Sequence, residues 1–490
     1  NCCLRSCHPQ YRGYLRKHVS LKTVPVLFSD ASKQEINQSL LLAEQAFNKF
    51  RKLDGLTRAK FLEKIGNEVE KNSNDIVTIA QNETCLGKTR LEMELSRTVS
   101  EIHTFAKLAR SEEWHNLPSQ SVGGKINAPR LITNNIPIGP VLVIGACNFP
   151  LAISVIGTDT ISALSVGCTV VVKAHPAHPQ TCQFLADIVI KVMKQSEIPL
   201  GTFQLIHGQN YKVTQNLVTQ PYTSCVAFTG SLRGGAKLSK LSSQRKKPIP
   251  FHGEMGSLNP VIVLPHKVEQ HPEQLASDYI QAVTLFAGQM CTKPGALFII
   301  DSNCNTPFLN QIKENVERQE ILPMLNSDVY ENFEKGVHFL KQKLSLLATN
   351  DNQLTSIKNP AYCRIFELDS TEFIQNTDLR TEAFGPASLL IKCKDENSLF
   401  QCIDSCEGSL TASIHCSKKE YPLAQRITQK LESKVGRMVW NGFPPGVAPG
   451  PATHHGGPWP ASTNSRYTSI GKEAYQRFIR PVCRQGFPVN

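Results

Sequence analysis

The 490-residue sequence lacks several features that would assign it to a protein class at once. It has no internal repeat, no low-complexity tract and no long block of like charge. The densest basic cluster, residues 245–247, is too short for an arm that binds nucleic acid. The formal net charge of +12 is spread along the chain, which favours an anionic small ligand over a nucleic-acid partner.

An unbroken apolar segment is also lacking. The longest uncharged run, residues 136–158, has the length of a membrane span, but Pro137, Pro140 and Pro150 interrupt it. It is typical of a buried strand, a turn and the start of a helix. We therefore expect no membrane span.

Cysteines at zinc-site spacing are missing, although the chain has 16 cysteines. Cys2, Cys3 and Cys7 lie close together, but no second cluster completes a metal site, so none is expected. Many unpatterned cysteines indicate reduced thiols and a cytoplasmic protein. The first residues lack both an initiator Met and the apolar core of a signal peptide, and we interpret them as a trimmed or partial N-terminus.

The apolar residues that are present follow two periods in turn. Residues 32–115 have helical spacing, with Ile36, Leu40, Ala43, Phe47 and Phe50 three to four apart. From Val141 onward, short apolar strands at 141–144, 169–172, 203–206 and 225–228 alternate with helices predicted near 151–165 and 182–194. This alternation predicts a parallel α/β sheet that binds its ligand at the carboxyl ends of its strands.

A second α/β region is predicted from strands at 261–264 and 297–300 up to Trp440. Residues 441–462 are rich in proline and glycine, which suits a loop over a site. A short helix and an extended end are predicted for 468–488, and a linker or flanking strand for 117–130.

A cysteine between glycines follows the helix predicted for 274–286. The segment reads Gly-Gln-Met-Cys-Thr-Lys-Pro-Gly at 288–295 and centres on Cys291. Four further segments accompany it in chain order: Gly-Ala-Cys-Asn-Phe-Pro at 145–150, Phe-Thr-Gly-Ser at 228–231, Phe-His-Gly-Glu-Met-Gly at 251–256 and Glu-Ala-Phe-Gly-Pro at 382–386. Any one of them alone is a weak signal.

As an ordered set, these segments resemble the aldehyde dehydrogenase superfamily over nearly the whole chain. Residues 172–176, 288–295, 441–444 and 455–458 look like the branch that contains NADP-dependent fatty aldehyde and 2-oxoglutaric semialdehyde dehydrogenases. The resemblance implies an α/β fold with a Rossmann-type cofactor domain (1–116 and 140–253), a catalytic domain (254–465) and a small oligomerisation arm (117–139 and 466–490). It also implies a homodimer or homotetramer.

The resemblance gives catalytic roles to Cys291, Asn148 and Glu254. A thiolate at Cys291 would add to the aldehyde, and a thioester would form after hydride transfer. The Asn148 amide and the backbone N–H of Cys291 would hold the oxyanion. Glu254 would activate the water that hydrolyses the thioester, and its place between Gly253 and Gly256 predicts a raised pKa.

The same resemblance implies a nicotinamide cofactor. Gly230 and Ser231 open a helix that could hold pyrophosphate, in place of a G-x-G-x-x-G turn after the first strand. Lys173 would reach the adenosine ribose and Glu382 the nicotinamide ribose, with Phe384 beside the ring. Pro176 replaces a glutamate that many NAD-preferring members carry, so with Arg233 and Lys237 nearby we expect NADP, with NAD an alternative.

The substrate side stays open at this point. His455 and Phe149 are the expected contact residues. Arg97 or Arg437 would suit a semialdehyde that carries a carboxylate, whereas a funnel of Phe149, Leu285 and Phe443 would suit a long-chain fatty aldehyde.

Two competing interpretations belong to different classes of protein. One is an enzyme that transfers the thioester to coenzyme A, and the second is an inactive nucleotide-binding scaffold. Glu254 argues against the transferase, because hydrolysis needs a base and thiol release does not. The complete set of Cys291, Asn148 and Glu254 argues against the scaffold.

Cys147 stands beside Asn148 where relatives usually have serine or tryptophan. It is interpreted as a packing residue. Its alternative role is a thiol switch, with oxidant sensitivity that a Cys147→Ser substitution would reduce.

Overall fold

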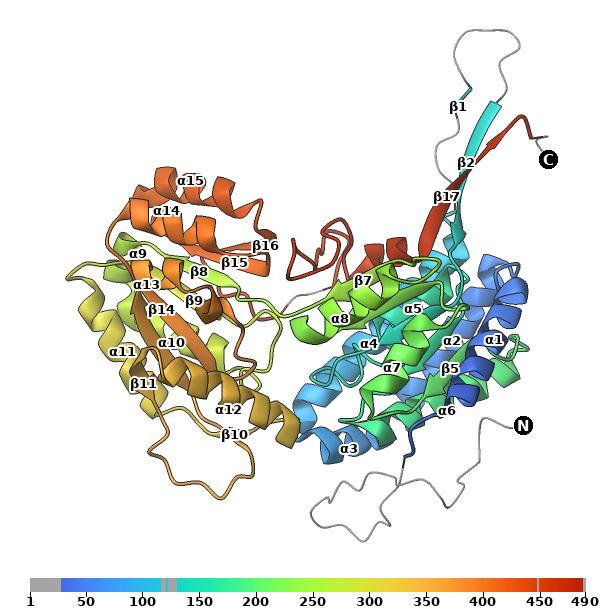
Figure 1. Cartoon of the computed structure of the whole chain (residues 1–490), viewed down its shortest axis with the longest axis horizontal. Coiled ribbons are helices and arrows are strands. Elements are labelled where there is room, and N and C mark those ends of the chain that lie inside the picture. Colours follow the sequence, from blue (N-terminus) through green and yellow to red (C-terminus); the bar gives the residue numbers. More distant parts are fainter. Residues whose placement is uncertain (1–27, 116–119, 122–129, 447–448, 488–490) are drawn as a thin grey trace.

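The structure is a computed structural model and describes residues 28–115, 120–121, 130–446 and 449–487. Cys2, Cys3, Cys7 and the N-terminus, which the sequence analysis interprets, therefore lie outside the described residues. Most of residues 117–130, predicted as a linker or flanking strand, lies outside them as well. Figure 1 shows two α/β lobes with a narrow arm that projects from one of them.

Four helices open the described chain, as the helical spacing predicts. They are α1 (Lys33–Phe50), α2 (Gly55–Lys71), α3 (Ser73–Thr84) and α4 (Lys88–Ser111). Helix α1 begins with a capping box between Ser32 and Glu35, and it buries the apolar stripe that starts at Ile36. Helices α2 and α4 pack along each other, and α2 also packs on α6 (Pro179–Gln195) of the same lobe.

The first sheet contains five parallel strands in the order β5-β4-β3-β6-β7. The strands are β3 (Val141–Ile144), β4 (Val170–Lys173), β5 (Phe203–Ile206), β6 (Cys225–Thr229) and β7 (Phe251–Glu254), and the helices are α5 (Thr158–Ser165), α6 (Pro179–Gln195), α7 (Tyr211–Thr219) and α8 (Leu232–Ser243). The strand order reverses at β3, which places a ligand crevice at the carboxyl ends of β3 and β6.

One predicted helix is shorter than expected. Helix α5 begins at Thr158, whereas the sequence predicts a helix from 151. The N–H groups of Leu151 and Ala152 are bound by the carboxylate of Glu94 on α4. A side chain distant in sequence therefore holds residues 151–152 outside the helix, and local periodicity does not reveal that.

The second sheet contains seven strands in the order β11-β13-β14-β9-β8-β15-β16, all parallel except the edge strand β11. The strands are β8 (Pro260–Val263), β9 (Ala296–Ile300), β11 (Ser345–Thr349), β13 (Arg364–Asp369), β14 (Ala387–Cys393), β15 (Ser409–His415) and β16 (Val435–Trp440). The helices are α9 (Pro265–Gln270), α10 (Pro272–Thr284), α11 (Asn305–Glu317), α12 (Ser327–Lys341), α13 (Ser370–Gln375), α14 (Glu396–Ser405) and α15 (Tyr421–Leu431), and β10 (Leu322–Pro323) pairs with β12 (Pro360–Ala361) separately.

The arm is built from segments at opposite ends of the chain. Strand β2 (Arg130–Pro137) pairs antiparallel with both β1 (Gln120–Ser121) and β17 (Ile479–Gln485). The 3₁₀ helix η3 (Lys472–Phe478) precedes β17 and packs against α5. The predicted short helix and extended end after residue 468 are thus present.

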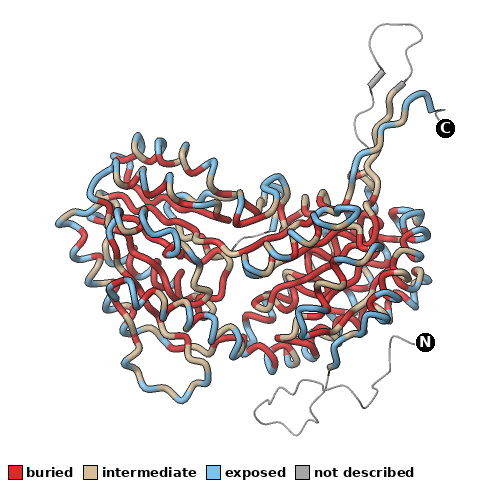
Figure 2. Tube along the Cα trace, in the orientation of Figure 1, coloured by how far each residue is buried: buried red, intermediate tan, exposed pale blue. Residues whose placement is uncertain are grey.

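Buried residues lie along most of the chain within both lobes, whereas the described residues of the arm are more exposed (Figure 2). Residues 255–259 connect β7 of the first sheet to β8 of the second. Chemistry placed at the end of β7 therefore faces the junction of the two lobes. Within the described part of the chain, no helix combines the length and the apolarity that a bilayer crossing requires.

Candidate active site

Cys291 lies in the loop that follows α10, and its side chain is half-buried. Phe286, Ala287 and Gly288 have positive φ angles of 53°, 57° and 66°. A Cβ atom on Gly288 would lie 2.3 Å from the carbonyl carbon of Gly385, so glycine allows this loop to contact the segment before β14.

A buried asparagine fixes the loop on the other side. Asn259 donates from Nδ2 to the backbone carbonyls of Cys291, at 2.8 Å, and of Lys293, at 2.9 Å. It stands immediately before β8, the first strand of the second sheet. The loop that carries Cys291 is therefore anchored to that sheet.

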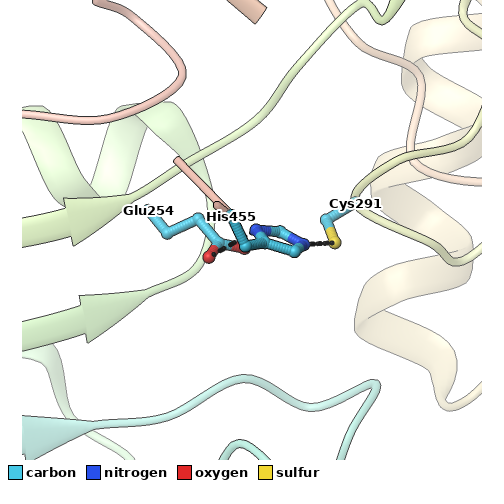
Figure 3. A group of neighbouring side chains, drawn as sticks. All are labelled: Glu254, Cys291 and His455. Carbon is cyan, nitrogen blue, oxygen red and sulfur yellow. Dashed lines mark hydrogen bonds and ion pairs between the residues drawn. The ribbon is translucent and has the colours of Figure 1, made fainter. Parts of the chain in front are cut away.

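Glu254, His455 and Cys291 form a continuous line across the junction of the lobes (Figure 3). Glu254 is the last residue of β7, and its Oε2 lies 3.0 Å from Nδ1 of His455. The Nε2 atom of His455 lies 3.5 Å from Sγ of Cys291. Glu254 and His455 are both buried, so water screens their charges little.

The pKa predicted for Glu254 is wrong in direction. Burial raises the pKa of this carboxyl group, but His455, the hydroxyl of Ser469 and Arg477 outweigh burial and lower it overall. The Ser469 hydroxyl donates to the same oxygen that faces His455. Burial lowers the pKa of His455, yet the charges of Glu254 and Cys291 raise it to about 10. The site therefore favours a carboxylate beside an imidazolium.

Asn148 approaches Cys291 from the first lobe. It follows β3, is buried, and donates from Nδ2 to the backbone carbonyl of Gln289 at 2.9 Å, two residues before the cysteine. The backbone carbonyl of Asn148 accepts a hydrogen bond of 2.6 Å from Nη2 of Arg90. Arg90 also pairs with Glu94. The structure thus brings Cys291, Glu254 and His455 together, and Asn148 contacts the loop that carries the cysteine.

The expected cofactor residues lie at the carboxyl edge of the first sheet. Lys173 ends β4 and is buried, and burial lowers its pKa to about 8. Ser231 caps α8 by accepting from the N–H of Gly234 at 3.2 Å. The N–H of Gly230 donates to the carbonyl of Glu254, and Arg233 lies in the first turn of α8.

Glu382 comes from the second lobe and reaches back to the first. A Cβ atom on Gly256 would lie 2.6 Å from Oε2 of Glu382, so this glycine gives the carboxylate its place near the end of β7. Burial raises the pKa of Glu382 to about 7, although the ammonium of Lys293 partly offsets it. Phe384 is half-buried two residues further along the same segment.

A nicotinamide dinucleotide fits these residues. Gly230 leaves space beside the Phe228 ring that a Cβ atom would fill at 2.8 Å, and the open first turn of α8 follows it. Lys173 comes from the first lobe and Glu382 from the second, and an ammonium and a carboxylate are groups that can donate to and accept from sugar hydroxyls.

The residues expected on the substrate side have different surroundings. Arg97 is paired with Glu101, with 3.5 Å between Nε and Oε1. Arg437 donates to the carbonyls of Gly446 and Pro444, and burial lowers its pKa overall, although the charge of Cys291 opposes that shift. Phe149 lies against the guanidinium of Arg90.

Leu285 and Phe443 line a cavity of about 510 Å³ between α10 and residues 441–445. Lys267, His271 and Asp278 line the same cavity. It is therefore not the purely apolar funnel expected for a fatty substrate.

Several residues at the site were not predicted from the sequence. Ser469 lies in no motif, and Gln289 lies in the segment 288–295 without a predicted role of its own, since each makes its contact with a partner distant in sequence. Arg90 and Glu94 have the spacing of an ordinary surface ion pair. Lys293 follows the cysteine by two residues, and its buried ammonium donates to the carbonyl of Ala387 at 2.5 Å.

Comparison with known proteins agrees with this geometry. The model of the aldehyde dehydrogenase family matches residues 20–480. The chain is 36% identical to alpha-ketoglutaric semialdehyde dehydrogenase from Acinetobacter baylyi, over 94% of this chain and 88% of that protein. It is 33% identical to alpha-ketoglutaric semialdehyde dehydrogenase 2 from Azospirillum brasilense, over 97% and 92%.

Among solved structures, a betaine aldehyde dehydrogenase double mutant from Staphylococcus aureus in complex with NAD⁺ superposes with a TM-score of 0.81. The two sequences are 18% identical, and the match covers 99% of this chain and 96% of the other. The fold class predicted from the sequence is thus confirmed.

Proposed function

Because the chain belongs to the aldehyde dehydrogenase family and oxidises aldehydes with a nicotinamide cofactor, we propose that its substrate is 2-oxoglutaric semialdehyde (2,5-dioxopentanoate). The names of the two relatives at 36% and 33% identity support this substrate. The product would be the dicarboxylate 2-oxoglutarate. Long-chain aldehydes are the weaker candidates, because charged side chains share the cavity beside Leu285 and Phe443.

The alignment of Glu254, His455 and Cys291 is the observation that carries the mechanism (Figure 3). His455 faces the sulfur with one ring nitrogen and the carboxylate with the other. This arrangement holds the proton of the Cys291 thiol on His455 as an imidazolium, which the Glu254 carboxylate stabilises, and leaves the sulfur as a thiolate. The thiolate of Cys291 then adds to the aldehyde carbon, and the carbonyl oxygen becomes an oxyanion.

Asn148 is the proposed oxyanion donor. One N–H of its amide is held by the carbonyl of Gln289, which fixes the amide plane beside the nucleophile loop. The other N–H is the donor offered to the oxyanion, together with the backbone N–H of Cys291. Removal of one such donor typically lowers the rate about 100-fold to 1,000-fold.

Lys173, Gly230, Ser231 and Glu382 are the proposed cofactor residues, with Phe384 beside the ring. A nicotinamide held by these residues would accept the hydride from the hemithioacetal, and Cys291 would then carry a thioester. The protein has to orient that adduct and exclude water until the hydride has left. Buried Asn148, Glu254 and His455 around the sulfur meet the second requirement.

Hydrolysis of the thioester is assigned to Glu254 and His455. Cys291 is one of the charges that raise the pKa of His455, so acylation of the sulfur removes that charge and eases proton loss from the imidazolium. Within the described residues, Oε1 of Glu254 is buried and has no hydrogen-bond partner. It is the oxygen available to accept a proton from the attacking water.

NADP is the proposed cofactor, with NAD as the alternative. Pro176 places no carboxylate near the adenosine ribose, and Arg233 and Lys237 both lie on α8, one turn apart. Catalytic efficiency measured with NADP and NAD tests the preference. A clear preference for NAD would contradict it.

Assay of a panel of aldehydes tests the proposed substrate. We expect the highest catalytic efficiency with 2,5-dioxopentanoate, a lower value with succinic semialdehyde and the lowest with hexanal and decanal. Lys267→Ala should raise KM for the acidic aldehydes without changing that for hexanal. Equal efficiency with decanal and the acidic aldehydes would reject the proposal.

The chain is also proposed to act as a cytoplasmic homo-oligomer. No disulfide joins the cysteines of the described residues, which suits a reducing compartment. The projecting arm and the edge strand β16, with Met438 and Trp440 exposed, are surfaces that a second copy could cover (Figure 1).

A further inference from the structure

A buried arginine outside the expected catalytic set contacts the segment that carries Asn148. Arg90 lies in the first turn of α4 and is 7% exposed. It donates from Nη1 to Oε2 of Glu94 at 2.7 Å and from Nη2 to the carbonyl of Asn148 at 2.6 Å. The first bond lies within α4, and the second joins α4 to the residue proposed to hold the oxyanion.

Two aromatic rings contact the guanidinium of Arg90. Its carbon lies 4.7 Å from the ring centre of Phe149 and 4.6 Å from that of Phe286. Phe149 follows Asn148 directly, and Phe286 belongs to the left-handed stretch before Cys291. One planar cation thus contacts the oxyanion segment of the first lobe and the nucleophile loop of the second.

Glu94 completes the attachment. Its Oε1 accepts the N–H groups of Leu151 and Ala152 at 2.8 and 2.9 Å, while its Oε2 binds Arg90. The ion pair therefore binds both ends of residues 148–152, with Arg90 at Asn148 and Glu94 at Leu151 and Ala152. Burying two opposite charges costs desolvation, and apolar side chains of similar volume would pack as well, so stability alone is a poor reason for this pair.

We propose that Arg90 is a positioning residue that sets the Asn148 amide at the distance from Cys291 that the oxyanion requires. This inference rests on the proposed function, in which Asn148 holds the oxyanion. A lysine ammonium also has several N–H donors, but it is a compact point charge and lacks the planar fork with which the guanidinium reaches Glu94 and the Asn148 carbonyl while it lies against two rings. The guanidinium shape is therefore what the site uses.

A double-mutant cycle separates this role from general stability. Arg90→Met and Arg90→Lys should each lower kcat for aldehyde oxidation about 10-fold to 100-fold, the cost of a small misplacement of a catalytic group. Asn148→Ala should lower it about 100-fold to 1,000-fold. The Arg90→Met/Asn148→Ala double variant should match Asn148→Ala alone, because Arg90 acts through the missing amide.

Arg58→Met is the matched control. Arg58 is also a buried arginine of the first lobe that pairs with a glutamate, Glu112, and lies over an aromatic ring, that of Trp114. It has no contact with the catalytic residues among the described residues, so this variant should lose thermal stability with kcat of the folded enzyme unchanged.

The rate at which iodoacetamide alkylates Cys291 measures the reactivity of the thiol in a reaction that forms no oxyanion. The alkylation rate and the affinity for the cofactor should stay within about twofold of wild type in both Arg90 variants. Losses that multiply in the double variant, or alkylation slowed as much as oxidation, would overturn the inference. If Asn148→Ala alone leaves kcat unchanged, the oxyanion role of Asn148 fails instead.

Discussion

At the residue scale, the contact between His455 and Glu254 changes the properties of both side chains. The pKa of the imidazole is raised from its ordinary 6.5 to about 10, and that of the carboxyl is lowered. A histidine or a glutamate in a glycine-rich segment of the sequence does not by itself indicate such a pKa shift. A lone carboxyl in this pocket would have a raised pKa through burial, so the neighbouring histidine reverses the expectation.

The first prediction concerns stability against pH. Because the pKa of His455 is raised on folding, its stabilising contribution is complete below about pH 6.5 and is lost as pH rises through about 10. His455→Gln should reduce the free energy of unfolding by about 3 kcal/mol at pH 6.5, since it leaves Glu254 buried without its partner. Urea unfolding at pH 6.5, 8 and 10 should show this difference shrinking with pH. A difference that stays constant would contradict the ion pair.

The second prediction concerns cofactor affinity. Glu382 has a pKa raised to about 7 by burial, so it gains charge as pH passes from 6 to 8. An ionised carboxylate accepts sugar hydroxyls better than a neutral one, and the Kd for NADPH should therefore fall over this range. Fluorescence titration checks this. Glu382→Gln should bind weakly with no such pH dependence, and an equal dependence in both proteins would exclude Glu382 as its source.

The third prediction tests the nucleophile itself. Cys291→Ser should retain cofactor binding, because the first-sheet residues proposed to bind the cofactor remain in place, while dehydrogenase activity falls by several orders of magnitude. Cofactor titration and turnover measured on the same preparation separate the two effects. Turnover near the wild-type rate would end the assignment of Cys291 as nucleophile.

At the element scale, the loop after α10 depends on a backbone conformation that most residues avoid. Three successive residues, Phe286, Ala287 and Gly288, have positive φ, and Gly288 contacts Gly385 without space for a Cβ atom. For the two non-glycine residues, Phe286 and Ala287, this conformation costs about 1–3 kcal/mol each and is retained where packing enforces it. Here the close approach to Gly385 and the hydrogen bond from Asn259 hold the loop in place, and Cys291 on this loop lies beside His455.

The fourth prediction follows from that loop. Gly288→Ala combines an unfavourable φ with a contact of 2.3 Å, so the loop must move away from Gly385. We expect a loss of about 2 kcal/mol in stability and a loss of kcat of about tenfold or more. Gly450→Ala is the control, because its Cβ would meet only Thr453 at 3.7 Å. Thermal unfolding and steady-state kinetics of both variants test the difference.

At the scale of the whole molecule, the site exists only where two lobes meet. Asn148 and Glu254 come from the first lobe, Cys291 from the second lobe, and His455 from the tail that follows the second sheet. Helix α4 adds Arg90 and Glu94 from the N-terminal helices. Any motion between the lobes therefore changes the distances on which catalysis depends.

The fifth prediction concerns assembly. Trp440 is 47% exposed and Met438 is 40% exposed on the edge strand β16. Trp440→Glu should convert an oligomer to a monomer if a second copy covers this edge, because a buried unpaired charge opposes association. Met93→Glu, at an exposed position on α4, should leave the mass unchanged. Light scattering after size-exclusion chromatography distinguishes the two, and an unchanged mass for both would exclude β16 from an interface.

The sequence by itself determined the α/β class, the positions of β3, β4, β5 and β6 in the first sheet and of β8 and β9 in the second, and the chain order of the motif segments. Short apolar runs and helical spacing reflect local backbone geometry, so the residues predicted for β3 and β5 are those that form these strands. The proposed nucleophile also followed, because the ordered motifs around Cys291 form a distinctive set. These properties depend on neighbours in the chain.

Only the tertiary structure decided how those segments act on one another. It decided the shortened start of α5, the downward shift in the pKa of Glu254, and the contacts of Arg90, Ser469 and Lys293. Each depends on groups more than a few residues apart in the chain that meet in a buried environment, where charges interact strongly. A sequence read along its length contains those residues but not the distances between them.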